Sequence, residues 1–498
     1  MADTTTVRAL MEESGVAFGT SGARGLVTAM TDRVCYGYTR GFLSYLAEVG
    51  EFSPGAEVAL AGDLRPSTPR VLRACAQAIR DAGGNPVFCG YVPTPALAVH
   101  AFATRTPSLM VTGSHIPDNR NGIKFHRAGG EVLKDDEAGM ARQQTALAGA
   151  RFDAGGALVD PAPLPPARDV ETGYVARYVE AFGPDAMAGL TVGLYQHSAV
   201  GRDVIARILA GLGAKVVPLG RSDTFIPVDT EALRPEDVDF ARGWAATQKL
   251  DAIASTDGDS DRPLLADARG EWLRGDILGL LCAKALGADV VVTPVSSNTA
   301  LEKCGAFARV ARSRIGSPYV IAAMREAGGR VVCGFEANGG FLLGSDIMWQ
   351  RRTLTALPTR DAVLPIVAVL AASKGRGIAA LCGELPPRVT YSDRIKDFPT
   401  ADSGAILAYL SVGDAAQRRA RIEAAFGAFA GTLASLDQTD GLRMTFADGA
   451  IIHLRPSGNA PELRCYTEAD DEAGARSLNA AALKTVRDGL AGLAQANV

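Results

Sequence analysis

The chain reads Val111-Thr-Gly-Ser-His-Ile-Pro-Asp-Asn-Arg-Asn-Gly-Ile-Lys-Phe125 where two apolar, strand-like runs meet at a polar loop. The first run, Ser108 to Val111, leads into small and turn-forming residues that prevent an immediate helix, and the second run, Ile123 to Phe125, carries Lys124. A hydroxyl on a tight loop with a cation nearby is one way to present a nucleophile or a covalently modified serine. Ser114 is therefore a candidate for either role. The alternative is an ordinary surface turn with a capping serine.

The rest of the chain alternates strand-like and helical patterns. Residues 57–62 are strand-like, a polar turn follows, and residues 69–81 have helical spacing with a proline in the first turn. Residues 82–90 end that helix and start another strand. The same order of patterns recurs at residues 190–220 and 288–334. We therefore predict three related α/β domains with mixed or mostly parallel sheets, whose strand-to-helix loops lie at a ligand-binding edge.

Two stretches rich in proline and glycine, 153–167 and 375–387, predict linkers between domains. The elements expected after the second linker are helices at 405–409, 415–434 and 470–494 and a hairpin at 440–454 with an Asp-Gly turn at 448–449. These elements predict a smaller C-terminal α+β domain. The expected domain ranges are 1–155, 168–270, 271–378 and 385–498.

Length and composition narrow the class of protein. A chain of 498 residues is too long for a single core, and 47% hydrophobic with 21% charged residues indicates a globular protein. A net charge of −4 argues against a nucleic-acid partner, and no apolar run is long enough to predict a membrane span. The N-terminal residues show no signal-peptide pattern. The eight cysteines include no C-x-x-C pair, so we expect reduced thiols in a cytoplasmic enzyme.

The segment Asp257-Gly-Asp-Ser-Asp-Arg262 follows a strand-like run and places three carboxylates close together. Such crowding is costly unless a cation compensates it. A calcium-binding hand loop requires glycine at its sixth position and glutamate at its twelfth, whereas this chain has Arg262 and Ala268 there. Ligation by oxygen alone predicts Mg²⁺, with Arg262 indicating an anion beside the metal. A solvated acidic turn is the alternative.

Two glycine-rich segments are candidates for ligand binding. Ala17-Phe-Gly-Thr-Ser-Gly-Ala-Arg-Gly25 could bring backbone amides to an anion, with Arg24 as a fork for phosphate; a flexible turn is the alternative. Gly334-Phe-Glu-Ala-Asn-Gly-Gly-Phe341 follows an apolar strand, and its Glu336 and Asn338 could hold sugar hydroxyls. A polar turn explains this second segment equally well.

The segment Arg455-Pro-Ser-Gly-Asn-Ala-Pro-Glu-Leu-Arg464 follows the predicted hairpin. Arg455, the hydroxyl of Ser457, Asn459 and the open backbone near Gly458 would make a cradle for a phosphate group.

Taken together and in order, these loops resemble those of the α-D-phosphohexomutase superfamily, which includes phosphomannomutase, phosphoglucomutase and phosphoglucosamine mutase. Residues 18–25 are similar to its opening loop, and 112–117 to a phosphoserine loop usually written Thr-Ala-Ser-His-Asn-Pro. Residues 257–262 resemble its Asp-Gly-Asp-Gly-Asp-Arg metal loop. Residues 335–340 correspond to a Gly-Glu-x-Ser-Gly-His sugar loop, and 455–461 to Arg-Pro-Ser-Gly-Thr-Glu-Pro. The resemblance covers nearly the whole chain.

The resemblance implies four domains around a central cleft, with one functional loop from each. It implies that Ser114 carries a phosphoryl group and, together with the aspartates of the metal loop, binds one Mg²⁺ ion. The phosphoryl group would pass to a hexose phosphate and return from a hexose 1,6-bisphosphate, which is also the activator. The metal ligands implied are Ser114, Asp257, Asp259 and Asp261. The residues expected to act near the transferring group or on the substrate are Lys124, Arg262, His115, Arg24, Glu336, Asn338, Arg455, Ser457, Gly458 and Asn459.

The chain departs from the family pattern at positions where the family carries histidine. The sugar loop has Gly340 in place of its histidine and Asn338 in place of its serine, and Ser317 stands where some mutases have a histidine. The usual source of a general base is therefore missing. Lys124 is the preferred proton acceptor and His126 the next, while His115 is more often structural in loops of this type. The phosphate loop has Asn459-Ala460 for Thr-Glu, which loses a carboxylate.

We expect a cytoplasmic, Mg²⁺-dependent phosphomannomutase that interconverts hexose 1-phosphate and hexose 6-phosphate. Phosphoglucomutase and phosphoglucosamine mutase are the alternatives within the class. A Mg²⁺-dependent sugar phosphatase, in which water takes the phosphoryl group, is an alternative from another class, and a non-catalytic sugar-phosphate binding protein is a third. We expect only small hexose phosphates as partners, neither nucleic acid nor membrane, and a monomer or homodimer.

Overall fold

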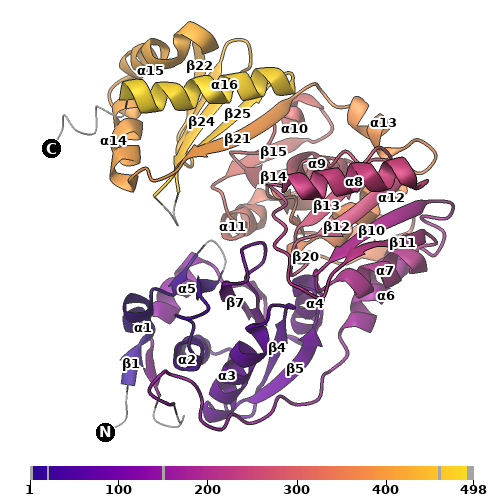
Figure 1. The fold of residues 1–498 in the computed structure, drawn as a ribbon, viewed down its shortest axis with the longest axis vertical. Coiled ribbons are helices and arrows are strands. Elements are labelled where there is room, and N and C mark those ends of the chain that lie inside the picture. Colours follow the sequence, from indigo (N-terminus) through magenta and orange to yellow (C-terminus); the bar gives the residue numbers. More distant parts are fainter. Residues whose placement is uncertain (1–3, 20–21, 148–151, 458–460, 491–498) are drawn as a thin grey trace. The chain divides into compact units, whose positions relative to one another are not determined.

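The computed structural model describes residues 4–19, 22–147, 152–457 and 461–490. The chain forms two compact units (Figure 1). The first comprises Met1–Val291 and Gly316–Cys382, and the second comprises Val292–Ile315 and Gly383–Val498. In the described part of the chain, no helix combines the length and apolar character needed to cross a membrane.

The first sheet of the first unit has the strand order β2-β3-β7-β6-β4-β5. Strand β4 runs parallel to β5 and β6, whereas β7 runs antiparallel to β6 and β3, so the sheet is mixed. Helix α3 begins where predicted, with proline in its first turn, and packs on β4 and β5. The elements are β1 (Thr4–Thr6), α1 (Val7–Ser14), β2 (Ala17–Phe18), β3 (Ala23–Leu26), α2 (Asp32–Glu48), β4 (Glu57–Gly62), α3 (Thr68–Asp81), β5 (Asn85–Tyr91), α4 (Thr94–Thr104), β6 (Ser108–Val111), β7 (Arg120–Arg127), β8 (Gly130–Glu131), α5 (Lys134–Ala141) and β9 (Gln144–Ala146).

The second sheet repeats this arrangement in the order β11-β10-β12-β13. Strand β10 is parallel to β11 and β12, and β12 is antiparallel to β13, as β4, β5, β6 and β7 are in the first sheet. The predicted recurrence of one α/β pattern is therefore confirmed for these two sheets. The elements are α6 (Glu171–Phe182), β10 (Thr191–His197), α7 (Arg202–Gly211), β11 (Lys215–Arg221), α8 (Pro235–Thr247), β12 (Ala252–Thr256) and β13 (Pro263–Ala266).

The third copy supplies a further antiparallel set of strands to the first unit, in which β17 pairs with β16 and with β20. The apolar helix α12 packs against α9. The elements are α9 (Gly275–Ala285), β14 (Val290–Pro294), α10 (Ala300–Lys303), β15 (Arg309–Ser313), α11 (Ser317–Ala327), β16 (Val332–Phe335), β17 (Phe341–Leu343), β18 (Ile347–Trp349), β19 (Arg352–Leu354), β20 (Leu357–Asp361) and α12 (Val363–Ser373). Of these, α10 and β15 belong to the second unit.

The second unit contains an antiparallel sheet in the order β21-β25-β24-β23-β22, on which α16 packs. The hairpin predicted at 440–454 is present as β23 and β24. The smaller C-terminal α+β part of the predicted fold class is confirmed. After α13 (Ile378–Gly383), at the end of the first unit, the elements are β21 (Val389–Ile395), α14 (Thr400–Ser411), α15 (Ala415–Ala430), β22 (Leu433–Asp437), β23 (Leu442–Phe446), β24 (Ile451–Pro456), β25 (Leu463–Ala469), α16 (Glu472–Thr485) and the π-helical turn Val486–Leu490.

Three boundary predictions need correction. The helix predicted at 415–434 ends at Ala430 because Gly431 adopts a positive φ of 81°, and the chain continues as β22. The linker predicted at 375–387 contains α13, whose Ile378 and Leu381 are buried. The C-terminal helical tail changes to a π-helical turn after Thr485, and residues 491–494 of the predicted tail lie outside the described residues.

Candidate functional site

The loop between β6 and β7 holds Ser114 in a strained, buried position. Ser114 has a φ of 56°, in the left-handed region that side chains other than glycine rarely adopt, and is 1% exposed. Its backbone N–H donates to the Thr112 hydroxyl at 2.8 Å. Its own hydroxyl donates to the Asp257 carboxylate at 2.5 Å. Ser114 is therefore a buried side chain bound to Asp257 and not a surface turn residue.

The buried Arg65, in the turn that follows β4, holds this loop in place. Its guanidinium donates to the carbonyls of Ser114, Ile116, Pro117 and Arg120 at 2.5 to 3.1 Å. A second set of contacts fixes Arg65 itself: its Nε pairs with the buried Asp63 at 3.1 Å, and its guanidinium stacks on the Phe225 ring. Sequence reasoning treated this segment only as a polar turn. Two opposite charges two residues apart, directly after an apolar strand, were the available signal.

The metal loop follows β12 and is buried. Asp257, Asp259 and Asp261 are each 0% exposed, and one oxygen from each lies within 4.8 Å of the others. Among the described residues, Asp259 Oδ1 and Asp261 Oδ1 have no hydrogen-bond partner. Buried carboxylate oxygens without partners are costly, and three all-oxygen ligands suit a hard divalent cation. The residues present therefore fit the predicted metal.

Hydrogen-bond donors from three elements, two of them cations, surround these carboxylates. Lys124 on β7 donates to Asp259 at 2.6 Å and to Asp261 at 2.5 Å, and the hydroxyl of Thr94, at the start of α4, donates to Asp259 at 2.5 Å. Arg360 on β20 is bound to Asp261 at 3.0 Å. Sequence reasoning missed Thr94 and Arg360, because neither lies near a recognisable motif.

The aspartates differ in how their surroundings affect their charge. Burial, together with repulsion from Asp259 and Asp261, raises the pKa of Asp257 well above its usual value. Burial would also raise the pKa of Asp261, but Arg360, Lys124 and Arg262 outweigh it and hold that pKa well below the usual range. A divalent cation would remove the repulsion that acts on Asp257.

Arg262 and His115 meet beside Ser114. Arg262 donates to Nδ1 of His115 at 2.9 Å, and the same nitrogen lies 3.5 Å from the Ser114 hydroxyl. Burial and the neighbouring Arg262 and Arg24 lower the pKa of His115, which keeps its ring neutral. A neutral ring whose Nδ1 accepts from arginine orients that arginine, so these contacts favour a structural role for His115.

Arg24 on β3 faces the same group of charges. Burial and the neighbouring Arg262 and Arg360 lower its pKa to about 10, which still leaves it charged at neutral pH. Several cations at one site create a strongly positive region that suits a phosphate group. Residues 20 and 21 of the predicted opening loop lie outside the described residues.

The sugar loop forms a tight turn between β16 and β17. The Asn338 side chain accepts from the Gly340 N–H at 2.9 Å, and the Asn338 carbonyl accepts from the Thr230 hydroxyl at 2.9 Å. Glu336 is bound by Arg360 at 3.2 Å. A cavity of about 150 Å³ adjoins this turn, and its lining includes Ala337 and Trp272. Asn338 is buried, and these contacts show that it shapes the turn.

The positions that lack the family histidines have other contacts. The Ser317 hydroxyl donates to Glu131 at 3.0 Å. His126, the second candidate base, lies 3.2 Å from the Ser108 hydroxyl, and its ring contacts Phe102 edge-on. Burial, with Lys124 and Arg360 nearby, lowers the pKa of His126 to about 4. Lys124 is thus the candidate base that contacts the metal loop.

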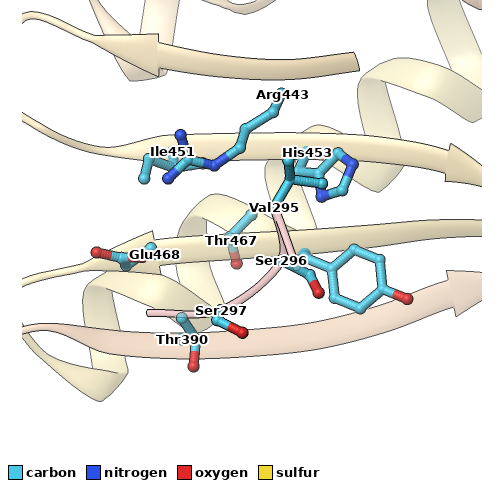
Figure 2. Close-up of a pocket in the computed structure, with 10 residues that line it drawn as sticks. Val295, Ser296, Ser297, Thr390, Arg443, Ile451, His453, Thr467 and Glu468 are labelled. Carbon is cyan, nitrogen blue, oxygen red and sulfur yellow. The ribbon is translucent and has the colours of Figure 1, made fainter. Parts of the chain in front are cut away.

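The predicted phosphate loop belongs to the second unit. Arg455 donates to Asp440 at 2.9 Å, and the N–H of the buried Ser457 donates to the Glu462 carbonyl at 2.9 Å. Gly458 and Asn459 lie outside the described residues. The second unit contains a small cavity that is lined by Arg443, His453 and Glu468 among others (Figure 2). Its volume is about 10 Å³. It has room for about one water molecule and is too small for a sugar phosphate.

Comparison with protein families matches nearly the whole chain. Models of phosphoglucomutase/phosphomannomutase α/β/α domains I, II and III match residues 15–148, 173–270 and 274–389, and the model of the C-terminal domain matches 407–485. The chain belongs to the phosphoglucomutase/phosphomannomutase family. The predicted family is thereby confirmed, as is the fold class of three α/β domains and a smaller C-terminal domain.

Individual relatives of this family agree. The chain is 44% identical to a phosphomannomutase from Salmonella muenchen over 97% of this chain and 98% of that protein. It is also 44% identical to a phosphomannomutase from Sinorhizobium fredii, over 96% and 100% of the two chains. A phosphoglucosamine mutase from Frankia alni is more distant, at 27% identity over 92% and 95%. A phosphoglucomutase/phosphomannomutase family structure from Burkholderia thailandensis superposes with a TM-score of 0.72 at 20% identity, covering 95% and 98%.

Proposed function

We propose that this enzyme is a Mg²⁺-dependent phosphomannomutase that interconverts mannose 1-phosphate and mannose 6-phosphate. The observation that carries the proposal is the hydrogen bond from the buried Ser114 hydroxyl to Asp257, at a loop where two carboxylate oxygens have no hydrogen-bond partner among the described residues. Two full-length phosphomannomutase relatives at 44% identity, against 27% for the phosphoglucosamine mutase, support mannose as the sugar.

Ser114 would carry the phosphoryl group and pass it to the free hydroxyl of the hexose phosphate. The bond between Ser114 Oγ and phosphorus breaks as the sugar oxygen bonds to phosphorus, and the hydroxyl proton passes to a base. The hexose 1,6-bisphosphate formed then returns its other phosphoryl group to Ser114. Bound through Ser114 and the three aspartates, Mg²⁺ would supply the electrophile that neutralises the transferring group.

The chain's own side chains would supply positioning and charge. Arg262, oriented by His115, and Arg24 place positive charge beside Ser114, which suits a transition state that spreads negative charge over phosphoryl oxygens. Lys124 is the proposed base because it lies at the metal loop, whereas His126 contacts Ser108 and Phe102. Because Lys124 donates to Asp259 and Asp261, it would accept the sugar proton only as it passes one of its own protons to a carboxylate.

Two of the family's loops supply the proposed substrate-binding residues. Glu336 and Asn338 would hold sugar hydroxyls, and Arg455 with residues 457–459 would hold the phosphate that does not react. These assignments follow the family motifs at those positions. The hexose bisphosphate would act both as intermediate and as activator.

The proposal is tested by steady-state kinetics with mannose 1-phosphate, glucose 1-phosphate and glucosamine 1-phosphate, each with Mg²⁺ and a trace of the matching 1,6-bisphosphate. We expect the highest kcat/KM with mannose 1-phosphate and no inorganic phosphate release that keeps pace with isomerisation. A higher kcat/KM for glucosamine 1-phosphate would reassign the sugar. Phosphate release without 6-phosphate product would establish a phosphatase.

A further inference from the structure

Arg360 connects two loops that the sequence treats as separate motifs. It lies on β20 and is 2% exposed. Its Nε and Nη2 both lie 3.0 Å from Asp261 Oδ2, and its Nη1 donates to Glu336 Oε2 at 3.2 Å. One buried guanidinium therefore binds a carboxylate of the metal loop and a carboxylate of the sugar loop.

The side chain of Arg360 occupies the space that Gly340 leaves open. A Cβ atom on residue 340 would lie 2.7 Å from Arg360 Cδ and 2.9 Å from Arg360 Cγ, closer than real Cβ contacts. The backbone of Gly340 is outside the left-handed region, so its conformation does not require glycine. Glycine is required here because the side chain of Arg360 fills the space that a Cβ atom would need. Residue 340 is also the position where the family motif carries histidine.

Ser317, at the position of the second missing histidine, contacts a carboxylate that also interacts with Arg360. Glu131 accepts from Ser317 at 3.0 Å and from Thr359, the neighbour of Arg360 on β20, at 2.6 Å. Burial disfavours the charged form of Arg360, but Asp261, Glu131 and Glu336 outweigh it and raise its pKa well above the usual value. Arg360 is therefore a permanent cation among three carboxylates.

We propose that Arg360 is a positioning residue for the mutase reaction, and that Gly340 is required to make room for it. Arg360 holds Glu336 in the orientation that accepts hydrogen bonds from the sugar, and ties that orientation to Asp261 of the metal loop. Hexose phosphate binding then depends on Arg360, although Arg360 itself is not required to touch the sugar. This inference rests on the proposed function, because it takes Glu336 as a sugar-binding residue.

A double-mutant cycle tests this dependence. The variants are Arg360→Met, Gly340→Ala and the pair, with Arg360→Lys as the conservative substitution. Binding of mannose 6-phosphate is measured by calorimetry in the presence of EDTA, and KM and kcat are measured with Mg²⁺. Gly193→Ala is the matched control, because a Cβ there would also meet a side-chain atom at 2.7 Å, Leu219 Cδ1, but in an apolar part of the core.

We expect Arg360→Met to weaken mannose 6-phosphate binding roughly ten- to hundredfold, as for loss of a charged hydrogen bond. Gly340→Ala should weaken it about tenfold by displacing Arg360, and the pair should bind no worse than Arg360→Met alone. Arg360→Lys should be intermediate, since it keeps the charge but loses the fork. Gly193→Ala should lower thermal stability and leave the Kd unchanged.

Effects of Gly340→Ala and Arg360→Met that multiply in the pair, or an unchanged Kd in Arg360→Met, would overturn the proposal. Different results would disprove the proposed function and the role of Arg360. If the wild-type protein binds mannose 6-phosphate but does not isomerise it, the proposed function is wrong while the binding cycle still decides the role of Arg360. If it binds no hexose phosphate, both are wrong.

Discussion

Two buried arginines, one in each unit, bind carboxylates in different ways. In the second unit Arg388 donates to Glu468 at 2.7 Å, to Asp470 at 2.7 Å and to the Gly449 carbonyl at 2.6 Å. Glu468, seen in Figure 2, also accepts from the backbone N–H and the hydroxyl of Thr299, so each of its oxygens has a partner. In the first unit Arg360 and Lys124 bind the aspartates, yet two of the buried aspartate oxygens have no hydrogen-bond partner among the described residues.

The difference separates structural from functional ion pairs. Around Arg388, the chain itself satisfies the buried charges and ties the turn between β23 and β24 to the sheet. Around the metal loop, two buried carboxylate oxygens lack a hydrogen-bond partner among the described residues, and three carboxylates lie close together. A divalent cation would bind the oxygens and compensate the charges. Burial and charge alone do not distinguish the two clusters. The buried oxygens that have no hydrogen-bond partner among the described residues do distinguish them. Substitutions in the two clusters should therefore affect different measurements.

The largest effect is expected for Ser114→Ala. Loss of the phosphoryl carrier should lower mutase kcat by about 10⁴-fold or more, as for the loss of other covalent nucleophiles. Thermal stability should change little. Ser255→Ala is the control, because Ser255 is also buried but its hydroxyl donates to the Tyr195 carbonyl and not to an aspartate. Full activity in Ser114→Ala would show that another group carries the phosphoryl group.

In the Arg388 cluster the effect should appear in stability instead. Arg388→Met leaves Glu468 buried without its cation and should lower the free energy of unfolding of the second unit by about 3–5 kcal/mol. Denaturant unfolding monitored in the second unit measures this. The kcat per folded molecule should stay within about twofold of wild type. A loss of kcat with unchanged stability would contradict the structural role of this cluster.

Asp257→Asn should raise the stability of the metal-free protein while weakening the binding of Mg²⁺. The substitution removes one of three crowded charges, so we expect a higher melting temperature in EDTA. Mg²⁺ should stabilise the wild-type protein, whereas its affinity for the variant should fall by at least about tenfold. Thermal unfolding titrated with Mg²⁺ measures both effects. A wild-type melting temperature that does not respond to Mg²⁺ would count against the metal site.

The smallest effect expected concerns His453, which lines the small cavity in Figure 2 and contacts the Asp440 carbonyl at 2.6 Å. Burial lowers its pKa to about 4. His453 therefore binds a proton near pH 6.5 in the unfolded chain but only near pH 4 in the folded chain. The free energy of unfolding falls as the pH drops through this window. His453→Gln should reduce that loss by on the order of 2 kcal/mol. An unchanged pH dependence in this variant would show that His453 does not contribute.

The sequence predicted the parts of the fold and site that depend on local patterns. Alternating apolar runs and turn residues located β4, α3 and the hairpin of β23 and β24, and motif spacing located Ser114 and the aspartates. Helix ends were less predictable, since the positive φ of Gly431 and the burial of Ile378 depend on tertiary packing. Arg65 and Arg360 were missed because their contacts join segments far apart in the chain.

The central claim is that Ser114 carries the phosphoryl group, and phosphate mapping tests it most directly. The protein is incubated with mannose 1,6-bisphosphate labelled in both phosphates, digested, and its labelled peptide sequenced by mass spectrometry. We expect one phosphoryl group on Ser114, which is transferred to give the bisphosphate when mannose 1-phosphate is added. No label, a label on another residue, or discharge to inorganic phosphate alone would contradict it.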